Sequence, residues 1–390
     1  MLTVVHSPDD ARIWHRQIRS LLDAGWQVTY AAPWAGYDLE PPAGVPDLRC
    51  IDVVRATGRD RLRAQVSARG VLRREARWHD VVLLHDPELI PTTLGLALPP
   101  VVWDVHEDAA AALEVKTWLP QVLRRPVAGA VRQMERLSER RHALLLADHH
   151  YADRFRRTHP VVPNTTTVPR TAPPAAGAPG PDGTLRVIYL GSVTLERGAA
   201  EMARIGQLLR RQRSSARAIS LEIIGPAHGP ARDILQRAHD AGDLSWSGPV
   251  PNDRALTRLD GALAGLSLLH DRPNFRLSLP TKVVEYFAHG VPVITTPLPL
   301  AVELVQRSSG GVVIPFGTVE EVSDAAVSTI LSWADQPEVA ADLGARAYTL
   351  ARRDLDWRVH GPEFVAALGR LARQHDRSAP DPAQGRHVFR

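Results

Sequence analysis

Short apolar runs recur along this sequence, and each is followed by a polar loop and a segment with helical spacing. The runs are rich in aliphatic and β-branched side chains, as buried strands are. Between the first two, residues 10–26 place apolar side chains three and four apart, and Gly25 stands where a helix C-cap is expected. Near-continuous apolar strands separated by helices predict a parallel sheet covered on both faces. The first such runs are LTVVH, QVTYAAP, DVVLLH, PPVVWDV and LLLAD.

The alternation stops at residues 161–184, which are dense in Pro, Gly and Ala, and then resumes. A second series runs from LRVIYLG, which begins at residue 185, to GGVVIP near residue 312. The predicted fold class is therefore α/β, with two doubly wound, Rossmann-like domains. Ligands of such sheets bind at the carboxyl ends of the strands, and we expect a cleft between the two domains. The predicted divisions are a first Rossmann-like domain 1–165, a linker 166–184, a second Rossmann-like domain 185–354, a terminal helix 355–373 that could cross back to the first domain, and a mobile tail 374–390.

Composition narrows the class of protein. Hydrophobic residues make up 44% of the 390 residues and charged residues 23%, as is typical of a soluble globular protein. Cys50 is the only cysteine, so no internal disulfide can form. No apolar run approaches the roughly eighteen residues of a membrane span, and the N-terminus lacks the pattern of a secretory signal. A cytoplasmic protein is expected.

Net charge and motif spacing limit the partners. The formal charge of +4 suits phosphate-bearing small molecules, an anionic membrane surface or nucleic acid. A nucleic-acid partner is not expected, because the chain has no zinc-finger spacing, RNP-type strand or basic region before heptads. A resident metal is not expected either, since HExxH, a cysteine pair and DxD at a strand end are all missing. The adjacent His149 and His150 cannot face one ion from a regular helix or strand.

The segment PTKVVEYFAHGVPVITT, which begins at Pro280, predicts a helix followed by a buried strand. Pro280 suits the first turn of a helix, and Gly290 suits its end. The free N–H groups and partial positive charge of a helix N-terminus attract anions, and Lys282 adds a cation there. Glu285 shares the face of Lys282 and could accept hydrogen bonds from two ribose hydroxyls. The same spacing also suits a surface Lys–Glu pair.

This segment resembles the PxKxxEYxAxGxPVI signature of retaining family-four glycosyltransferases, which have the GT-B fold. The resemblance implies that Glu285 binds the ribose of a nucleoside-diphosphate sugar, UDP- or GDP-linked, without a metal. The family often carries a second glutamate eight residues earlier, where this chain has Leu277. In place of that glutamate, the backbone N–H groups of the loop Arg276, Leu277, Ser278 and Leu279 are candidates to hydrogen-bond the sugar hydroxyls.

Two further segments are similar to donor-binding elements of that family. In LRVIYLGSVTLERGAAEM a strand ends at Gly191, where a ligand can approach the backbone. Arg197 stands at the start of the next helix, and its guanidinium can donate two hydrogen bonds to a diphosphate. Ser192 replaces the arginine that usually follows this glycine in the family. LSWSGPVP resembles the family's VxFxGxV element, which implies that Gly248 lies near the nucleotide base.

Three polar segments of the N-terminal half each follow a predicted strand, so all three point to the carboxyl edge of one sheet. They are HSPDDARIWHRQ, LLHDPEL and WDVHED. These segments resemble the DxRI, HDPEL and YDxHE runs of a bacterial subset of the same family, which acts in polysaccharide or glycoconjugate assembly. The resemblance implies that His106 is catalytic and approaches the donor sugar near the reacting carbon. The acceptor-side candidates are Asp10, Arg12, His85, Asp86, Glu88 and Glu107.

The predicted function is transfer of a sugar from a nucleoside-diphosphate sugar to an acceptor hydroxyl with retention at the anomeric carbon. Rival interpretations are a sugar-nucleotide 2-epimerase of the same fold and a non-catalytic nucleotide-sugar-binding relative. A third rival is a membrane-peripheral scaffold. Residues 116–141 mix apolar and arginine side chains, so they could contact an anionic membrane, although Pro120 and Pro126 interrupt the pattern and a solvated basic helix fits equally.

Overall fold

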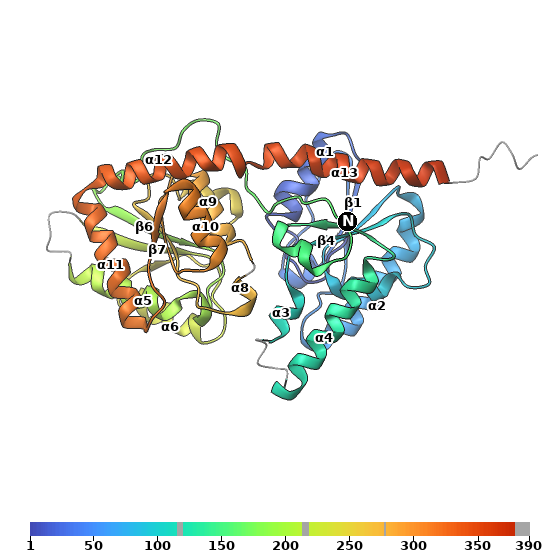
Figure 1. Cartoon of the computed structure of the whole chain (residues 1–390), viewed down its shortest axis with the longest axis horizontal. Helices are drawn as coiled ribbons and strands as arrows, with labels where there is room; N and C mark the ends of the chain where they lie inside the picture. Colours follow the sequence, from blue (N-terminus) through green and yellow to red (C-terminus); the bar gives the residue numbers. More distant parts are fainter. Residues whose placement is uncertain (115–119, 213–217, 277, 379–390) are drawn as a thin grey trace, which may run out of the picture. The chain divides into compact units, whose positions relative to one another are not determined.

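A computed structural model describes residues 1–114, 120–212, 218–276 and 278–378. The chain forms two compact units. Unit 1 is Met1–Asn164 together with the segment that begins at Arg358, and unit 2 is Thr165–Trp357. Each unit holds a parallel sheet with helices packed against it (Figure 1). The two doubly wound α/β domains predicted from the alternating pattern are thus present.

The sheet of unit 1 consists of a β1–β2 pair and a β3–β4–β5 group, all parallel. Leu2 joins the two groups, because it forms parallel bridges to both Ala31 and Leu84. The predicted first strand, LTVVH, is therefore reduced to this bridging residue. The strands are β1 (Val28–Ala32), β2 (Leu48–Asp52), β3 (Val82–Leu84), β4 (Val101–Val105) and β5 (Ala143–Leu146).

The predicted helix over residues 10–26 is present as a π-helical turn, Ile13–Ile18, that continues into α1 (Arg19–Asp23). Gly25 follows it with a φ of +78°, as a C-cap glycine should. Strand β2 and helix α2 (Arg61–Glu75) were not predicted, because β2 is half-exposed and α2 is arginine-rich with few apolar positions. The remaining helices of this part of the chain are α3 (Ala109–Glu114) and α4 (Gln121–Ser138).

Unit 2 contains a six-stranded parallel sheet in the order β11–β10–β9–β6–β7–β8. Along the central strand β6, Val187 and Tyr189 pack on one face, whereas Ile188 and Leu190 pack on the other. Both faces are therefore buried, which explains the unbroken apolar sequence. The strands are β6 (Leu185–Leu190), β7 (Ile219–Ile224), β8 (Ser245–Trp246), β9 (Ala264–Ser267), β10 (Val293–Thr295) and β11 (Gly311–Val313).

Helices cover both faces of this sheet (Figure 1). One layer contains α5 (Ala199–Arg211), α6 (Pro230–Asp240) and α11 (Val319–Asp335). The other contains α7 (Asn252–Thr257), α9 (Thr281–Ala288), α10 (Pro299–Ser308) and the packed face of α12 (Pro337–Asp354). A short helix α8 (Pro273–Arg276) precedes α9. Since the strands are parallel, all six end at the same edge, and the loops after β6 and β9 meet there.

The last helix, α13, runs from Trp357 to Ser378. It extends past the predicted end at residue 373, since no helix breaker occurs before Pro380. The rest of the predicted mobile tail, residues 379–390, lies outside the described residues, as do residues 116–119 of the predicted membrane segment. Within the described ranges, no helix combines the length and apolar composition that a membrane crossing requires.

Candidate active site

Unit 2 gathers the predicted donor-binding residues at the carboxyl edge of its sheet. Strand β6 ends at Leu190, and Gly191 turns the chain with a φ of +116°. Gly225, which follows β7, lies very close to this turn, because a Cβ on Gly225 would meet the Gly191 carbonyl oxygen at 2.2 Å. Gly248 extends the same edge, because its carbonyl accepts a hydrogen bond from the Gly225 N–H at 2.8 Å. These glycines leave the backbone open to close approach by a ligand.

Arg197 ends a short 3₁₀ turn directly before α5. Its guanidinium donates to the carbonyl oxygen of Ser192 at 3.5 Å and lies 5.7 Å from the centre of the Phe275 ring. Gly198 then starts the helix with a φ of +89°, and a Cβ there would stand 2.8 Å from atoms of Leu268. Only glycine fits between the end of β9 and α5, and this close packing holds Arg197 beside the Gly191 turn.

Lys282 is buried in the first turn of α9, with its ammonium 4.6 Å from the centre of the Tyr189 ring. Its Cε would lie 3.9 Å from a Cβ on Gly191, so the side chain reaches the turn after β6. Burial and, to a smaller extent, the nearby Arg197 charge lower the pKa of Lys282 to about 7, with the Glu285 carboxylate opposing both. The fold therefore brings the cations of Arg197 and Lys282 and the carboxylate of Glu285 together at this edge of the sheet.

Tyr286, which follows Glu285 in the motif, has a structural task. Its hydroxyl accepts from the Leu190 N–H at 2.9 Å and donates to the Leu266 carbonyl at 3.0 Å. The ring lies where a side chain on Gly265 would be, since a Cβ there would meet it at 2.4 Å. Tyr286 thus fixes α9 to strands β6 and β9, which sets the position of Lys282 and Glu285.

The predicted sugar-contacting loop is only partly described. Leu277 lies outside the described residues. The Arg276 guanidinium makes a two-point ion pair with Asp271, at 2.6 and 2.7 Å, on the exposed surface. The backbone N–H groups of Arg276 and Ser278 already donate to carbonyls at 3.2 and 3.4 Å. Leu279 lies directly before Pro280, the N-cap of α9. Two of the proposed backbone donors are thus engaged within the chain.

At the carboxyl edge of the unit 1 sheet, Asp104 is the centre of a buried network. It sits on β4 and is fully buried. Its carboxylate accepts two hydrogen bonds from Arg12, at 2.8 and 2.7 Å, and one from the Gln17 amide at 2.8 Å. Burial alone would raise the pKa of Asp104, but the Arg12 charge and these hydrogen bonds hold it well below its usual value.

His106 follows β4, two residues beyond Asp104. Its Nδ1 lies 3.0 Å from the Asp104 carbonyl oxygen and 3.6 Å from the carboxylate. Burial would lower the pKa of His106, but the hydrogen bond and charge of Asp104 outweigh it and raise that pKa to about 9. The other ring nitrogen, Nε2, lies 2.9 Å from Nε2 of His6. Both ring nitrogens of His106 therefore have protein partners.

His6 connects His106 to two further carboxylates. Its Nε2 lies 3.3 Å from Asp86, and its Nδ1 lies 3.9 Å from Asp10. Asp86 is buried and also accepts from the Thr3 hydroxyl and the N–H of Val4, at 3.0 and 2.6 Å. It thereby ties the first segment of the chain to the end of β3.

The structure brings together five of the seven residues predicted for this edge and gives the other two different surroundings. Arg12, His85 and Asp86 are almost entirely buried in the Asp104 network. Glu88 pairs instead with Arg61 of α2. Glu107 is exposed next to His106, and its charge contributes to the raised pKa of that histidine.

One trio in this network has the composition of a metal site. Ligand atoms of His85, Asp104 and His106 lie within 4.8 Å of one another. The trio does not suit a cation, however, because the carboxylate of Asp104 already binds the guanidinium of Arg12 on both oxygens. A metal ion there would stand against a buried positive charge.

Sequence reasoning missed three members of the unit 1 network, namely His6, Gln17 and Asp104. One signal was present: Asp104 interrupts the otherwise apolar run VVWDV, and a charged residue inside a buried strand needs a partner. Nothing local indicates that Gln17, on the π-helical turn, would reach it.

Comparison with known proteins follows this geometry. Residues 184–332 match the family model described as "Glycosyl transferases group 1". They lie within unit 2 and include Arg197, Lys282 and Glu285. No curated protein sequence matches the chain.

Solved structures resemble the chain over nearly its whole length. Sucrose-phosphate synthase from Thermosynechococcus elongatus has a TM-score of 0.70 at 14% identity, covering 95% of this chain and 94% of that one. The chain has the GT-B fold. Anabaena HepE in complex with UDP-glucose has a TM-score of 0.64 at 12% identity, covering 93% and 97%. WaaG, a glycosyltransferase involved in lipopolysaccharide biosynthesis, has a TM-score of 0.62 at 12% identity, covering 92% and 95%.

The donor-binding candidates Gly191, Arg197, Gly248, Lys282 and Glu285 all lie in unit 2, within the residues matched by the group 1 model. The family match and the fold together support a glycosyltransferase.

Proposed function

We propose that this protein is a retaining glycosyltransferase that moves a sugar from a nucleoside-diphosphate sugar to an acceptor hydroxyl. Unit 2 binds the donor, with Arg197 and Lys282 on the diphosphate and Glu285 on the ribose. Gly191 and Gly248 allow the nucleotide to approach the strand edges. The backbone around Ser192 also faces the diphosphate in this proposal, and the described loop residues Arg276, Ser278 and Leu279 are the candidates for contact with the sugar.

The observation that carries this proposal is the pairing of like charges at Gly191. Lys282 is buried and close enough to Arg197 for that charge to lower its pKa. Two cations held at one edge repel each other, the Glu285 carboxylate offsets this only in part, and a diphosphate would relieve the remaining repulsion. The α9 N-terminus adds free N–H groups beside Lys282. A polyphosphate ester fits this edge better than a neutral ligand does.

Catalysis rests mainly on stabilising the departing diphosphate. Fixed cations and helix N–H groups act where negative charge develops, without rearranging during the reaction. Retention then follows from attack on the same face, with a phosphate oxygen taking the acceptor proton, so no protein carboxylate need act as a base. In unit 1, His106 orients the donor sugar, and Asp10 and Glu107 are the acceptor-side candidates that remain near the surface.

The donor is a UDP- or GDP-sugar. UDP-glucose is the first compound to test, because HepE was solved in complex with UDP and with UDP-glucose. We place the reaction in polysaccharide, glycoconjugate or glycosylated natural-product synthesis.

Thermal-shift screening against nucleoside-diphosphate sugars tests the donor site, because a ligand that binds only the native state raises Tm. Glu285→Ala and Arg197→Ala should each weaken binding of the best donor by about tenfold or more. Arg211→Ala, an exposed arginine at the end of α5, is the matched control and should bind normally. Normal binding by both site variants would show that the site is wrong. Conversion of the donor without acceptor would instead indicate an epimerase, and binding without turnover a non-catalytic relative.

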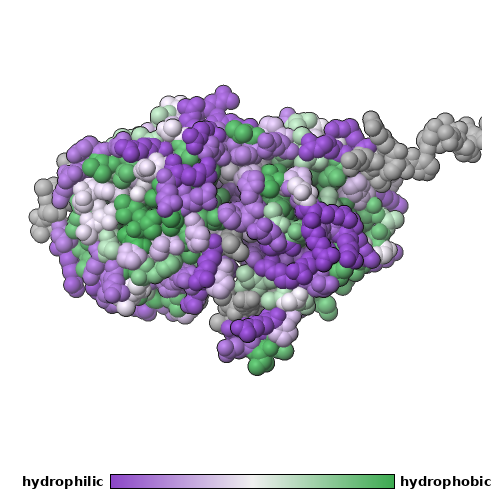
Figure 2. Space-filling model, viewed as in Figure 1, coloured by the Kyte–Doolittle hydropathy of each residue, from purple (hydrophilic) through white to green (hydrophobic). Residues whose placement is uncertain are grey.

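Helix α4 supports peripheral membrane contact. Val122 is 80% exposed at the start of the helix, and Leu123 and Leu137 are also exposed. Figure 2 shows hydrophobic surface beside strongly hydrophilic surface where α4 begins. Such a surface can insert apolar side chains while arginines meet anionic headgroups. Val122→Asp with Leu123→Asp should abolish co-sedimentation with phosphatidylglycerol vesicles, whereas wild-type binding to phosphatidylcholine alone should be weak. Failure of the wild type to bind either vesicle would exclude membrane contact.

A further inference from the structure

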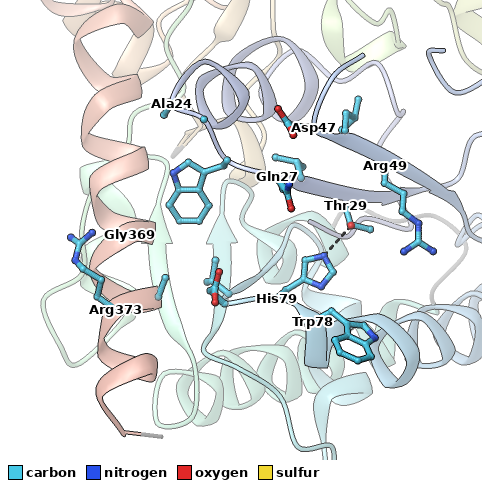
Figure 3. Close-up of a pocket in the computed structure, with 16 residues that line it drawn as sticks. Ala24, Gln27, Thr29, Asp47, Arg49, Trp78, His79, Gly369 and Arg373 are labelled. Carbon is cyan, nitrogen blue, oxygen red and sulfur yellow. Dashed lines mark hydrogen bonds between the residues drawn. The ribbon is translucent and has the colours of Figure 1, made fainter. Parts of the chain in front are cut away.

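Unit 1 contains a cavity at the edge of the sheet opposite the Asp104 network. It has a volume of about 730 Å³. The residues directly before β1, β2 and β3 form three of its sides, and α13 forms another (Figure 3). The amino ends of parallel strands lie at the opposite edge from the carboxyl ends, so this cavity is separate from His106 and its partners.

Part of the cavity wall is fixed by internal hydrogen bonds. One ring nitrogen of His79 lies 2.9 Å from the Glu75 carbonyl oxygen. The other lies 2.9 Å from the Thr29 hydroxyl (Figure 3). The guanidinium of Arg49 makes a two-point contact with the Glu75 carboxylate, at 2.7 and 3.3 Å. These groups shape the wall, and the charge of Arg49 is largely balanced by its partner.

Two tryptophans line the cavity. Trp26 packs beside α13, since a Cβ on Gly369 would lie 3.7 Å from its ring. Trp78 is 72% exposed, which is unusual for so large an apolar side chain. In Figure 3 Trp78 lies on the side of the cavity away from Gly369 and Arg373 of α13. Exposed aromatic rings at a concave site offer flat apolar surfaces for a ligand that is apolar on one face and polar at its edge.

The other lining groups set the charge of the ligand. Asp47, Asp80, Gln27 and Arg373 all line the cavity and are exposed. With Arg49 balanced by Glu75, the Asp47 and Asp80 carboxylates face the Arg373 guanidinium, and the Arg77 guanidinium lies 4.7 Å from the centre of the Trp78 ring. The charges of these groups balance, so a neutral ligand fits better than a phosphate or a nucleotide. Carboxylate and amide groups instead suit neighbouring hydroxyls, because each can hold two hydrogen bonds at once.

We propose that this cavity binds a neutral saccharide chain, with Trp78 stacking on a sugar ring and Asp47, Asp80 and Gln27 holding its hydroxyls. The proposal stands independently of the donor site in unit 2. If sugar transfer also occurs, the cavity would bind a growing or acceptor glycan at a part of the chain remote from its reacting end, and so keep the glycan attached to the enzyme. Such a second attachment raises the effective concentration of the chain end.

Saturation-transfer NMR with the full chain tests the proposal. The probes are maltohexaose, cellohexaose and chitohexaose at millimolar concentration, with spermidine and inorganic phosphate as charged comparisons. Trp78→Ala should weaken binding of the preferred hexasaccharide about tenfold, as expected for loss of an aromatic anchor. Ala372→Trp, which fills the cavity from α13, should abolish it. Val66→Ala, an equally exposed position on α2 outside the cavity, is the control and should bind as wild type does.

Three outcomes would overturn the proposal: no saturation transfer to any hexasaccharide, equal transfer in wild type and both cavity variants, or binding of spermidine or phosphate in preference to all three sugars. Asp80→Asn provides a second measure, since the amide keeps hydrogen-bonding capacity and the fold. It should retain part of the saccharide affinity while losing any affinity for spermidine. Donor thermal shifts should be unchanged in all these variants, which separates failure here from failure of the donor site.

Discussion

The Nε2 atoms of His6 and His106 lie 2.9 Å apart, while Nδ1 of His106 lies 3.0 Å from the Asp104 carbonyl oxygen. In a contact between two ring nitrogens, one must donate and the other must accept. The pKa of about 9 for His106 assigns the extra proton to His106 at neutral pH, with His6 accepting. His106 can therefore meet a donor sugar only if this contact opens or if His6 takes part.

His6→Ala should reduce transfer because it releases the ring of His106 from its position. We expect kcat to fall about tenfold or more, with little change in donor Kd, because the proposed donor-binding residues lie in unit 2. His6→Gln should recover part of the activity, since the amide can still accept from His106. The control is His15→Ala, which removes a half-buried histidine paired with Asp9. Full activity in His6→Ala would remove His6 from the mechanism.

The pH dependence of stability should carry the signature of His106. Its pKa is raised from 6.5 to about 9 in the folded state, so the folded protein holds this proton more tightly than the unfolded chain. The resulting stability is fully present below pH 6.5 and is lost as pH rises through 9, by up to about 3 kcal/mol. His106→Gln should flatten the decline over this range in urea unfolding curves. A wild-type curve without that component would contradict the assignment.

Lys282 should have the opposite effect. Its pKa is lowered from 10.5 to about 7, so the folded state disfavours the charged form. This penalty is fully present below pH 7 and is relieved as pH rises towards 10.5. Lys282→Met should therefore raise the Tm of the ligand-free protein at pH 7 and below, yet abolish donor binding.

Donor affinity offers an independent check on Lys282. A diphosphate favours the charged ammonium, so binding above pH 7 should take up a proton and should weaken as pH rises. Calorimetry in buffers of different ionisation enthalpy measures that uptake. Unchanged donor affinity between pH 7 and 9 would argue against contact between Lys282 and the diphosphate.

Tyr286→Phe separates a structural role from a binding one. The substitution leaves the buried Leu190 N–H and Leu266 carbonyl without their shared partner, which costs about 1–3 kcal/mol. We expect lower stability in urea, with donor Kd nearly unchanged once the protein is folded. Tyr348→Phe, whose hydroxyl donates to Pro169 at the half-buried surface, should cost less. Equal losses in the two variants would contradict the bridging role.

Local sequence was sufficient for most of the fold. The apolar runs that form β1, β3–β7 and β9–β11, the glycines at positions 25 and 191 and the chemistry of Lys282 and Glu285 depend on residues close in the chain. The exceptions have physical causes. Strand β2 is half-exposed, α2 carries few apolar positions, and the first apolar run contributes only a bridging residue between β1 and β3.

The sequence by itself determined the two α/β series and the helix that follows Pro280, because periodicity and helix ends are local properties. Only the tertiary structure decided which polar groups meet. Arg12 reaches Asp104, ninety-two positions away, and His6 reaches His106, one hundred positions away, because Leu2 inserts between β1 and β3, and β4 lies beside β3. Strand order is set by packing over the whole sheet, and no short segment encodes it.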